Sequence, residues 1–410
     1  MSKEKRRVPK LRFPGFTEDW EQCKLESLGK IITGNTPSTL KKEYWSANSE
    51  GVVWITPTDI NSVKTDCSER LLTEEGASQA RIVPANSILV TCIASIGKNT
   101  INTVEAAFNQ QINALVPHLS NSYFILTMLN NMESAFKRVA GTSATSIINK
   151  KEFGQLSALL PSVEEQNKIG EIFELIDKSI TLHQRKLEHL NLKKKALLQK
   201  LFPKNGERYP ELRFPGFADA WEQCKLGSIG STYTGLSGKT KEDFGHGEAQ
   251  YITYLNVFQN TISDTTMTDK VEIDTTQNEV KYGDVLFTTS SETPEEVGMS
   301  SVWLSDTPNI YLNSFCFGFR PNQKIDPYFL GYSLRAPYMR DKIKILAQGI
   351  SRYNISKNKV MELEISMPNN EEQKLLGTFL QHIDLIITLH QRKLEHLQLQ
   401  KKALLQQLFI

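Results

Sequence analysis

Apolar residues recur every three or four positions along two long stretches of the chain, residues 164–201 and 371–408. This spacing predicts two long amphipathic helices, each with one narrow apolar stripe. In both stretches the apolar positions follow a seven-residue pattern, which is typical of a coiled-coil seam. The seam residues are Ile176, Ile180, His183, Leu187, Leu190, Leu197 and Leu201 in the first stretch, and Ile383, Ile387, His390, Leu394, Leu397, Leu404 and Leu408 in the second.

Both helices have the same predicted start. Ser162 followed by Glu165, and Asn369 followed by Glu372, fit the capping box, in which the side chains at the cap and three residues later satisfy each other's backbone amides. A stripe this narrow is best buried by pairing the two helices with each other. An antiparallel pair would place the remaining parts of the chain at opposite ends of a rod, whereas a parallel pair would place them on one side.

Four polar residues lie on the predicted seam. His183 and His390 are expected to fix the register of the pair, although an imidazole at these positions can also titrate or bind a partner. Lys194 and Lys401 are expected to lay their stems along apolar neighbours and keep their charges in water.

The chain contains an internal repeat. Residues 11–34 align without gaps on residues 212–235 with 16 identities in 24 positions, and residues 180–202 align on 387–409 with 20 identities in 23. Between these matched pieces, residues 35–140 and 236–348 show no alignment. Two nearly identical frames therefore hold two different inserts, which suggests the same partner for the frames and different targets for the inserts; a drifted tandem duplication is the plainer alternative.

The inserts mix strand and helix patterns. Residues 52–55, 87–93 and 284–289 are short runs typical of β-strands, and residues 123–139 and 327–347 are expected to be helical. The predicted fold class is α+β, with two α/β-mixed insert domains joined by two long helices in a pseudo-twofold repeat. The predicted boundaries are 1–160 and 204–367 for the insert domains, and 161–203 and 368–410 for the helices.

Composition narrows the class of protein. The formal net charge of the 410 residues is only +2, so a nucleic-acid or membrane partner would have to be recognised by local charge. The five cysteines are scattered without Cys-x-x-Cys spacing, which argues against a disulfide framework and against a zinc site. No signal peptide and no membrane-spanning stretch is evident, and we expect a cytoplasmic protein in a reducing environment.

The chain lacks the sequence motifs of common enzyme chemistry. Gly238-Lys239-Thr240 resembles the end of a phosphate-binding loop, but position 233, where the loop needs glycine, is tyrosine. No dinucleotide or S-adenosylmethionine loop, no base-flipping Asn-Pro-Pro-Tyr segment, no nuclease carboxylate cluster and no metal-ligand spacing is present. We therefore expect neither a catalytic nor a metal-ligating residue in this chain.

Polar and basic loops that contain aromatic residues are candidate DNA contacts, because these side chains pair with base edges and phosphates. Residues 178–204 also carry eight basic residues and one glutamate, a surface that suits a phosphate backbone, an acidic protein or solvent alone. The candidate DNA-binding residues are Thr36, Ser38, Lys41, Lys42, Tyr44, Ser143 and Thr145 in the first insert, and Ser237, Lys239, Lys241, Ser290, Ser291, Arg352 and Tyr353 in the second.

The order of the motifs resembles the specificity subunit of type I restriction–modification enzymes. Each copy has LRFPGFxxxWEQCKL, an insert, a polar loop, Pro-x-x-Glu-Glu-Gln and ITLHQRKLEHLxLxKKALLQ, and the resemblance covers essentially the whole chain. The polar loop departs from it, because Gly141-Thr142-Ser143 is matched only loosely by Gly349-Ile350-Ser351, which puts equal roles for the two loops in doubt.

The resemblance implies a division of labour. Each insert would be a target recognition domain that reads one half of a bipartite double-stranded DNA site. The helices would form an antiparallel coiled coil that sets the gap and docks two methyltransferase (M) subunits. No cofactor would bind this chain, because S-adenosylmethionine, ATP and Mg would belong to the M subunits and to restriction (R) subunits. The alternatives are a bifunctional DNA methyltransferase or nuclease, and a coiled-coil scaffold that binds only protein.

Overall fold

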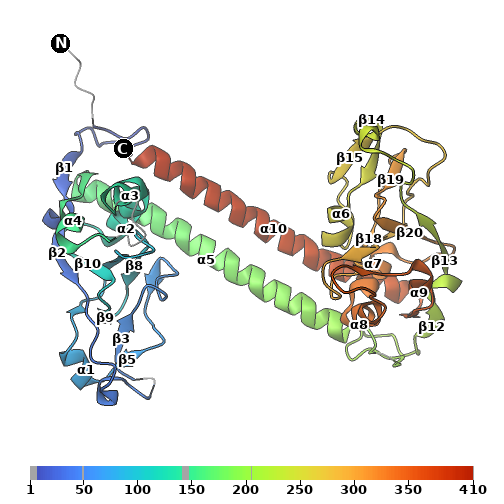
Figure 1. Ribbon diagram of the computed structural model, residues 1–410, viewed down its shortest axis with the longest axis horizontal. Helices are drawn as coiled ribbons and strands as arrows, with labels where there is room; N and C mark the ends of the chain where they lie inside the picture. The colour runs from blue at the N-terminus through green and yellow to red at the C-terminus, as the bar shows by residue number, and fades with distance from the viewer. Residues whose placement is uncertain (1–6, 49, 141–146, 205, 410) are drawn as a thin grey trace, which may run out of the picture. The chain divides into compact units, whose positions relative to one another are not determined.

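The computed structural model describes residues 7–48, 50–140, 147–204 and 206–409 (Figure 1). The chain forms two compact units: unit 1 is Met1–Arg185 with Arg392–Ile410, and unit 2 is Lys186–Gln391. Each unit thus contains one insert and a part of both long helices. The units divide the chain within the helices, whereas the predicted boundaries lie at residues 160, 203 and 367.

The described part of unit 1 holds two mixed sheets and a two-stranded pair. The strand orders are β2-β10-β7-β8-β4, β5-β3-β9-β6 and β1-β11. Pairing is antiparallel except between β3 and β9 and between β4 and β8. The strands are β1 Glu21–Lys24, β2 Gly29–Thr33, β3 Val52–Ile55, β4 Lys64–Thr65, β5 Leu71–Leu72, β6 Ile82–Val83, β7 Ile88–Thr91, β8 Asn99–Asn102, β9 Ala106–Phe108, β10 Ile112–Pro117 and β11 Ser157–Leu160.

Helices cover the larger sheet of unit 1, where α2 packs on β7 and β8. The helices are α1 Glu74–Ser78, α2 Ser122–Asn131, α3 Glu133–Ala140, α4 Lys150–Gln155 and the first long helix, α5 Val163–Lys200. The prediction that residues 123–139 are helical is confirmed, with a break at Met132 that divides them into α2 and α3. Met132 leaves the helical conformation (ψ 15°) after Asn130 and Asn131, which have weak helix propensity.

The described part of unit 2 holds the corresponding strands with a different second sheet. The strand orders are β13-β20-β16-β18, β15-β14-β19, β17-β21 and β12-β22. The strands are β12 Glu222–Lys225, β13 Gly230–Thr234, β14 Phe244–Ile252, β15 Thr268–Val271, β16 Val285–Thr288, β17 Ser290–Ser291, β18 Ser300–Val302, β19 Ile310–Leu312, β20 Cys316–Pro321, β21 Tyr353–Asn354 and β22 Glu364–Met367. The predicted strands 52–55, 87–93 and 284–289 are confirmed as β3, β7 and β16.

The helices of unit 2 follow the order of unit 1. They are α6 Tyr254–Gln259, α7 Pro327–Arg335, α8 Pro337–Ile345, α9 Lys357–Met361 and the second long helix, α10 Asn370–Leu408. The predicted helix over residues 327–347 is also interrupted, at Ala336, which has ψ 146°. The residue before a proline disfavours the helical region, so Pro337 ends α7 and starts α8.

Within each unit the two long helices run antiparallel. In unit 1 the end of α10 (red in Figure 1) lies beside the first turns of α5, where Phe409 packs on Phe173 with ring centroids 6.0 Å apart. In unit 2 the last turns of α5 lie beside the first turns of α10, and Leu201 shares a core with Leu376. All fourteen predicted seam residues are buried or half-buried, and the exposed positions of both helices lie between them.

The helix starts are confirmed within one residue, but the predicted capping boxes form only in part. Ser162 Oγ accepts from the Glu165 amide at 3.4 Å, and Asn369 Oδ1 accepts from the Glu372 amide at 2.9 Å. The two glutamate side chains do not reach back to the cap. Each instead accepts a bidentate pair from an arginine of the repeated LRFPGF segment.

That arginine pair fixes each LRFPGF segment to a long helix. Arg12 donates to both carboxylate oxygens of Glu165 at 2.8 Å, and Arg213 donates to both oxygens of Glu372 at 2.8 and 2.7 Å. The glutamate side chains are only 1% exposed. Hydrogen bonding to the buried carboxylate raises the pKa of each arginine, so each guanidinium stays charged.

Candidate nucleic-acid interface

The first insert presents its candidate residues on the segment from residue 35 to residue 45. Thr36, Ser38, Lys41 and Lys42 are exposed, and Thr36 Oγ1 donates to Gln110 Oε1 at 2.6 Å. Tyr44 differs from them because its side chain is buried, and its hydroxyl accepts from Lys41 Nζ at 2.9 Å. The Tyr44 hydroxyl therefore helps to hold the ammonium group of Lys41 in position.

Two further side chains of this region were not identified from the sequence. Leu40 is 93% exposed at the tip of the segment, between polar residues and the two lysines. Arg70 lies with its guanidinium 5.6 Å from the ring of Trp45, which packs edge-on against Trp54. Trp45, Arg70 and Lys42 line one groove of about 430 Å³. Arg70 follows a polar loop without any local pattern, so only the fold brings it beside Trp45.

In the second insert the candidate residues differ in exposure. Ser237 and Lys241 are exposed. Lys239 is not, because its ammonium group pairs with Asp274 at 2.8 Å and its side chain is 13% exposed. Hydrogen bonding from Lys239 lowers the pKa of Asp274, so the two remain an ion pair at neutral pH. The lysine of the apparent phosphate-binding loop is thus engaged with a carboxylate.

Ser290 and Ser291 are buried in this structure. They form β17, which pairs antiparallel with β21, so that Ser290 lies opposite Asn354 and Ser291 opposite Tyr353. The Ser290 carbonyl also accepts from the Tyr254 hydroxyl at 2.6 Å. The two serines therefore hold the Arg352 loop in place, and Tyr353 is half-buried beside them.

Exposed apolar and basic side chains lie on two loops of the second insert, the turn between β19 and β20 and the loop before β21. The guanidinium of Arg352 lies 5.8 Å from the ring of Phe315, which is 55% exposed on the turn between β19 and β20. Ile350, in the same loop as Arg352, is 95% exposed. Phe315 was not identified from the sequence, although the Asn313-Ser314 pair before it is typical of a turn.

The corresponding turn of the first insert has different chemistry. Phe315 is the residue before β20, and its equivalent before β10 is Gln111, whose side chain accepts from Asn109 at 3.0 Å. An exposed aromatic ring in one insert therefore corresponds to an amide in the other. Ser143 and Thr145, the remaining candidates of the first insert, lie outside the described residues.

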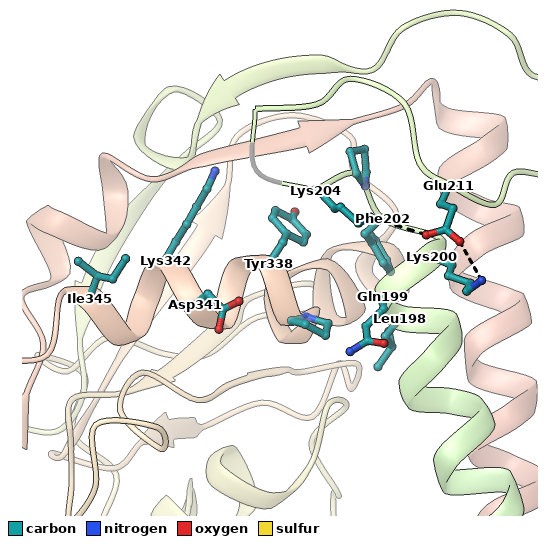
Figure 2. Close-up of a pocket in the computed structure, with 12 residues that line it drawn as sticks. Leu198, Gln199, Lys200, Phe202, Lys204, Glu211, Tyr338, Asp341, Lys342 and Ile345 are labelled. Carbon is teal, nitrogen blue, oxygen red and sulfur yellow. Dashed lines mark ion pairs between the residues drawn. The ribbon is translucent and has the colours of Figure 1, made fainter.

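Unit 2 also has a cavity of about 440 Å³ where α5 ends against α8 (Figure 2). Phe202 and Tyr338 form part of its wall, and Lys200 pairs with Glu211 at 2.8 Å at its edge. None of the candidate DNA residues lines it. The cavity belongs to the frame contacts at the helix end.

The described residues contain no group of three or more His, Cys, Asp or Glu side chains arranged to hold a metal ion.

The buried Cys92 thiol accepts a hydrogen bond from Asn113 at 3.1 Å, and burial raises the pKa of this thiol to about 11. Among the helices in the described part of the chain, none is long and apolar enough to span a membrane.

The sequence matches a known family model twice. The model of the type I restriction modification DNA specificity domain matches residues 17–192 and 218–399. The MjaIX type I restriction enzyme specificity subunit of Methanocaldococcus jannaschii is 27% identical over 55% of this chain and 55% of its own length. The MjaVIII specificity subunit of the same organism is 24% identical over 96% of this chain and 92% of its own length.

Solved structures share the fold. The S subunit of a type I restriction–modification system from M. genitalium has a TM-score of 0.61 at 15% identity and covers 98% of this chain and 99% of its own. A second structure, from work on assembly and conformational transition of the type I R-M system, has a TM-score of 0.53 at 15% identity and covers 97% of this chain and 98% of its own. With two matched domains over most of its length, this chain belongs to the family of type I restriction–modification specificity subunits, whose role is DNA recognition.

Proposed function

We propose that this chain is the non-catalytic specificity subunit of a type I complex and that each insert domain reads one half of a bipartite, asymmetric double-stranded DNA site. The long helices set the gap between the halves and dock two M subunits. R subunits join the full complex. S-adenosylmethionine, ATP and Mg bind the partner subunits, and this chain supplies the recognition of the DNA sequence.

The observation that carries this proposal is that identical frame contacts hold two inserts with unlike tips. The Arg12–Glu165 and Arg213–Glu372 pairs have the same atoms and the same distances within 0.1 Å. At the equivalent turns before β10 and β20, one insert has Gln111 in a local hydrogen bond, and the other has Phe315 exposed beside Arg352. Unlike tips on like frames suit two unlike half-sites.

The chemistry of both tips suits DNA. Lysine and arginine bind phosphates and guanine edges, and an exposed apolar side chain contacts thymine methyl groups or a base step. Among the predicted contacts we favour Lys41, Lys42 and Arg352, because they are exposed. Lys239, Ser290 and Ser291 would contact DNA only after a local rearrangement.

Exposed leucines at equivalent positions of the two helices support docking of one kind of partner twice. Leu182 and Leu389 are 67% and 54% exposed, and Leu192 and Leu399 are 68% and 66% exposed. All four lie between the seam positions, so pairing of α5 with α10 does not require them. Their recurrence in both copies fits two equal docking sites for two M subunits.

The test is to co-express the chain with a candidate M subunit in a methylation-free host and to map N6-methyladenine by long-read sequencing. The expected result is one split motif with two different halves and a fixed gap of about 5–8 base pairs, within one helical turn of about 34–36 Å. A stable complex without new methylation would favour the protein-only scaffold. Binding of S-adenosylmethionine by the isolated chain would favour the bifunctional enzyme.

Changing the length of the helices tests the role of the spacer separately. Adding one heptad between Gln184 and Lys194, and one at the equivalent place between Gln391 and Lys401, should lengthen the gap and leave both half-sites unchanged. An unchanged gap would show that the helices do not set the spacing.

A further inference from the structure

In each unit, a carboxylate of one long helix binds a lysine of the other long helix and a tyrosine of the insert domain. In unit 1, Asp177 of α5 accepts from Tyr123 of α2 at 2.7 Å and from Lys401 of α10 at 2.6 Å. We call this set lock 1. It joins three elements through the two oxygens of one carboxylate.

Unit 2 contains the equivalent set, lock 2. Asp384 of α10 accepts from Tyr332 of α7 at 2.7 Å, and its other oxygen lies 2.5 Å from Lys194 Nζ of α5. The helix residues of the two locks correspond under the repeat offset, since Asp384 repeats Asp177 and Lys401 repeats Lys194. The expectation that both lysines keep their charges in water is therefore wrong. Their ammonium groups bind the carboxylates, and their side chains are only 21% and 24% exposed.

The surroundings keep the tyrosine of each lock protonated. Burial, reinforced by the neighbouring aspartate, raises the pKa of Tyr123 and of Tyr332, so each hydroxyl stays protonated and donates. The Lys194 ammonium also lies 5.5 Å from the ring centre of Tyr332.

The locks select one register of the helix pair. The positions one heptad before and after Asp177 are Gly170 and Gln184, and those around Asp384 are Gly377 and Gln391. A slip by one heptad would therefore place each lysine opposite a residue without a charge. The leucines and isoleucines in the middle of the seam are interchangeable under such a slip, so there the locks add to the register contacts that Phe409 and Leu201 make at the helix ends.

The locks also disfavour the parallel pair. Residues at equivalent seam positions face each other in a parallel coiled coil, which would place Lys194 against Lys401. In the antiparallel arrangement within each unit, each lysine meets an aspartate instead. Each lysine–aspartate pair therefore favours both the antiparallel direction and one register of the two helices.

We propose that Tyr123–Asp177–Lys401 and Tyr332–Asp384–Lys194 are positioning residues that fix the helix register and the seat of each insert domain on it, and so the length of the gap in the DNA site. This inference rests on the proposed function, because the gap is its readout. The seam supplies the stability of the pair, and the locks restrict its register within the rod.

The test uses the full chain in complex with M subunits and maps methylation for Lys194→Met with Lys401→Met. We expect both half-sites to remain the same while sites with neighbouring gaps become methylated, with about a tenfold rise in their share. The matched control is Lys195→Met with Lys402→Met, two exposed lysines that also repeat each other; it should keep the single wild-type gap. Lys194→Arg with Lys401→Arg retains the ion pairs and should also keep it.

A second set of variants decides the question if the methionine variant does not assemble. Asp177→Asn with Asp384→Asn keeps an oxygen acceptor for each tyrosine and removes only the ion pairs, so this variant should assemble and also methylate sites with neighbouring gaps. A single unchanged gap in the asparagine variant or in the methionine variant overturns the proposal. Absence of a split motif in the wild-type complex would instead overturn the proposed function, so the two failures are distinguishable.

Discussion

The two units keep the contacts of the frame and change the surface of the insert. Arg12–Glu165 and Arg213–Glu372 match atom for atom, as do the hydrogen bonds from Leu11 to Gln407 and from Leu212 to Lys200. The second sheets differ: unit 1 has the order β5-β3-β9-β6, and unit 2 has β15-β14-β19. Residues that hold an insert in place are thus constrained, whereas residues that project from it are free to differ.

The difference is concentrated where a strand ends and a loop begins. Gln111 and Phe315 each precede the equivalent strands β10 and β20, yet one is an amide within a local hydrogen-bond network and the other an exposed ring beside Arg352. A turn can exchange such residues at little cost to the sheet, because the strand behind it retains its backbone pairing. Such a turn can therefore vary without destabilising the domain.

Removing the arginine of either frame pair should produce the largest effect. Arg12→Met and Arg213→Met each leave a glutamate that is 1% exposed without its partner, which costs about 3–5 kcal/mol of unfolding free energy. We expect Arg12→Met to destabilise unit 1 and Arg213→Met to destabilise unit 2 by equal amounts, measured by urea unfolding with hydrogen exchange resolved to each unit. A loss of stability in only one of the two variants would contradict the equivalence of the two frames. Lys10→Met, on an exposed neighbour of Arg12, is the control.

Exchanging residues at the insert tips should change recognition and leave folding intact. Arg352→Ala should weaken, by about 1–3 kcal/mol, the recognition of only those sites that carry the half read by unit 2. Competition binding of the complex to DNA variants in each half measures this. Equal loss on unrelated DNA would assign Arg352 to phosphate contact, and Lys357→Ala is a control on the same unit.

Much of the frame could be predicted from the sequence because each of its patterns occurs twice. The long helices and their seam follow from local periodicity, as do the strands β3, β7 and β16 of the inserts. The partners of Glu165, Lys194 and Lys401 could not be predicted, because Arg12 lies 153 residues from Glu165 and Asp177 lies 224 residues from Lys401. Local reasoning assigned these side chains to the helix cap and to solvent.

The inserts were less predictable for the same reason. Ser290 and Ser291 belong to a polar segment typical of an exposed loop, yet they are buried because β17 pairs with β21 from a distant part of the chain. Phe315 lies next to a buried strand, yet the turn exposes it. Composition locates such loops, and only the pairing of distant strands decides which side of a loop faces solvent.

Removing the lysines at the tip of the first insert should have a smaller effect that depends on salt. Lys41→Ala and Lys42→Ala each remove one exposed cation, so each should lower the slope of log affinity against log salt by about one if the lysine binds a phosphate. Titrations of the complex at several salt concentrations, with one specific and one unrelated DNA, measure the slope. A slope that changes only on the specific DNA would point to base contact instead.

The smallest expected difference between the units concerns their stability at acidic pH. Hydrogen bonds from Lys64 and Lys178 lower the pKa of Glu174 below its usual range, whereas the equivalent position in unit 2 is Gln381, which does not titrate. A carboxyl whose pKa is lower in the folded state contributes stability above its unfolded pKa and loses it as the pH falls through the folded value. Unit 1 should therefore lose about 0.5 kcal/mol as the pH falls below about 5, since the pair is partly exposed. Glu174→Gln should remove that loss, as measured by hydrogen exchange in α5 near residue 174. Gln381→Glu should not create a loss of stability at acidic pH in unit 2, because residue 385, the equivalent of Lys178, is leucine. If Gln381→Glu instead created a loss equal to the one that Glu174→Gln removes, the effect would be assigned to the net charge of the unit.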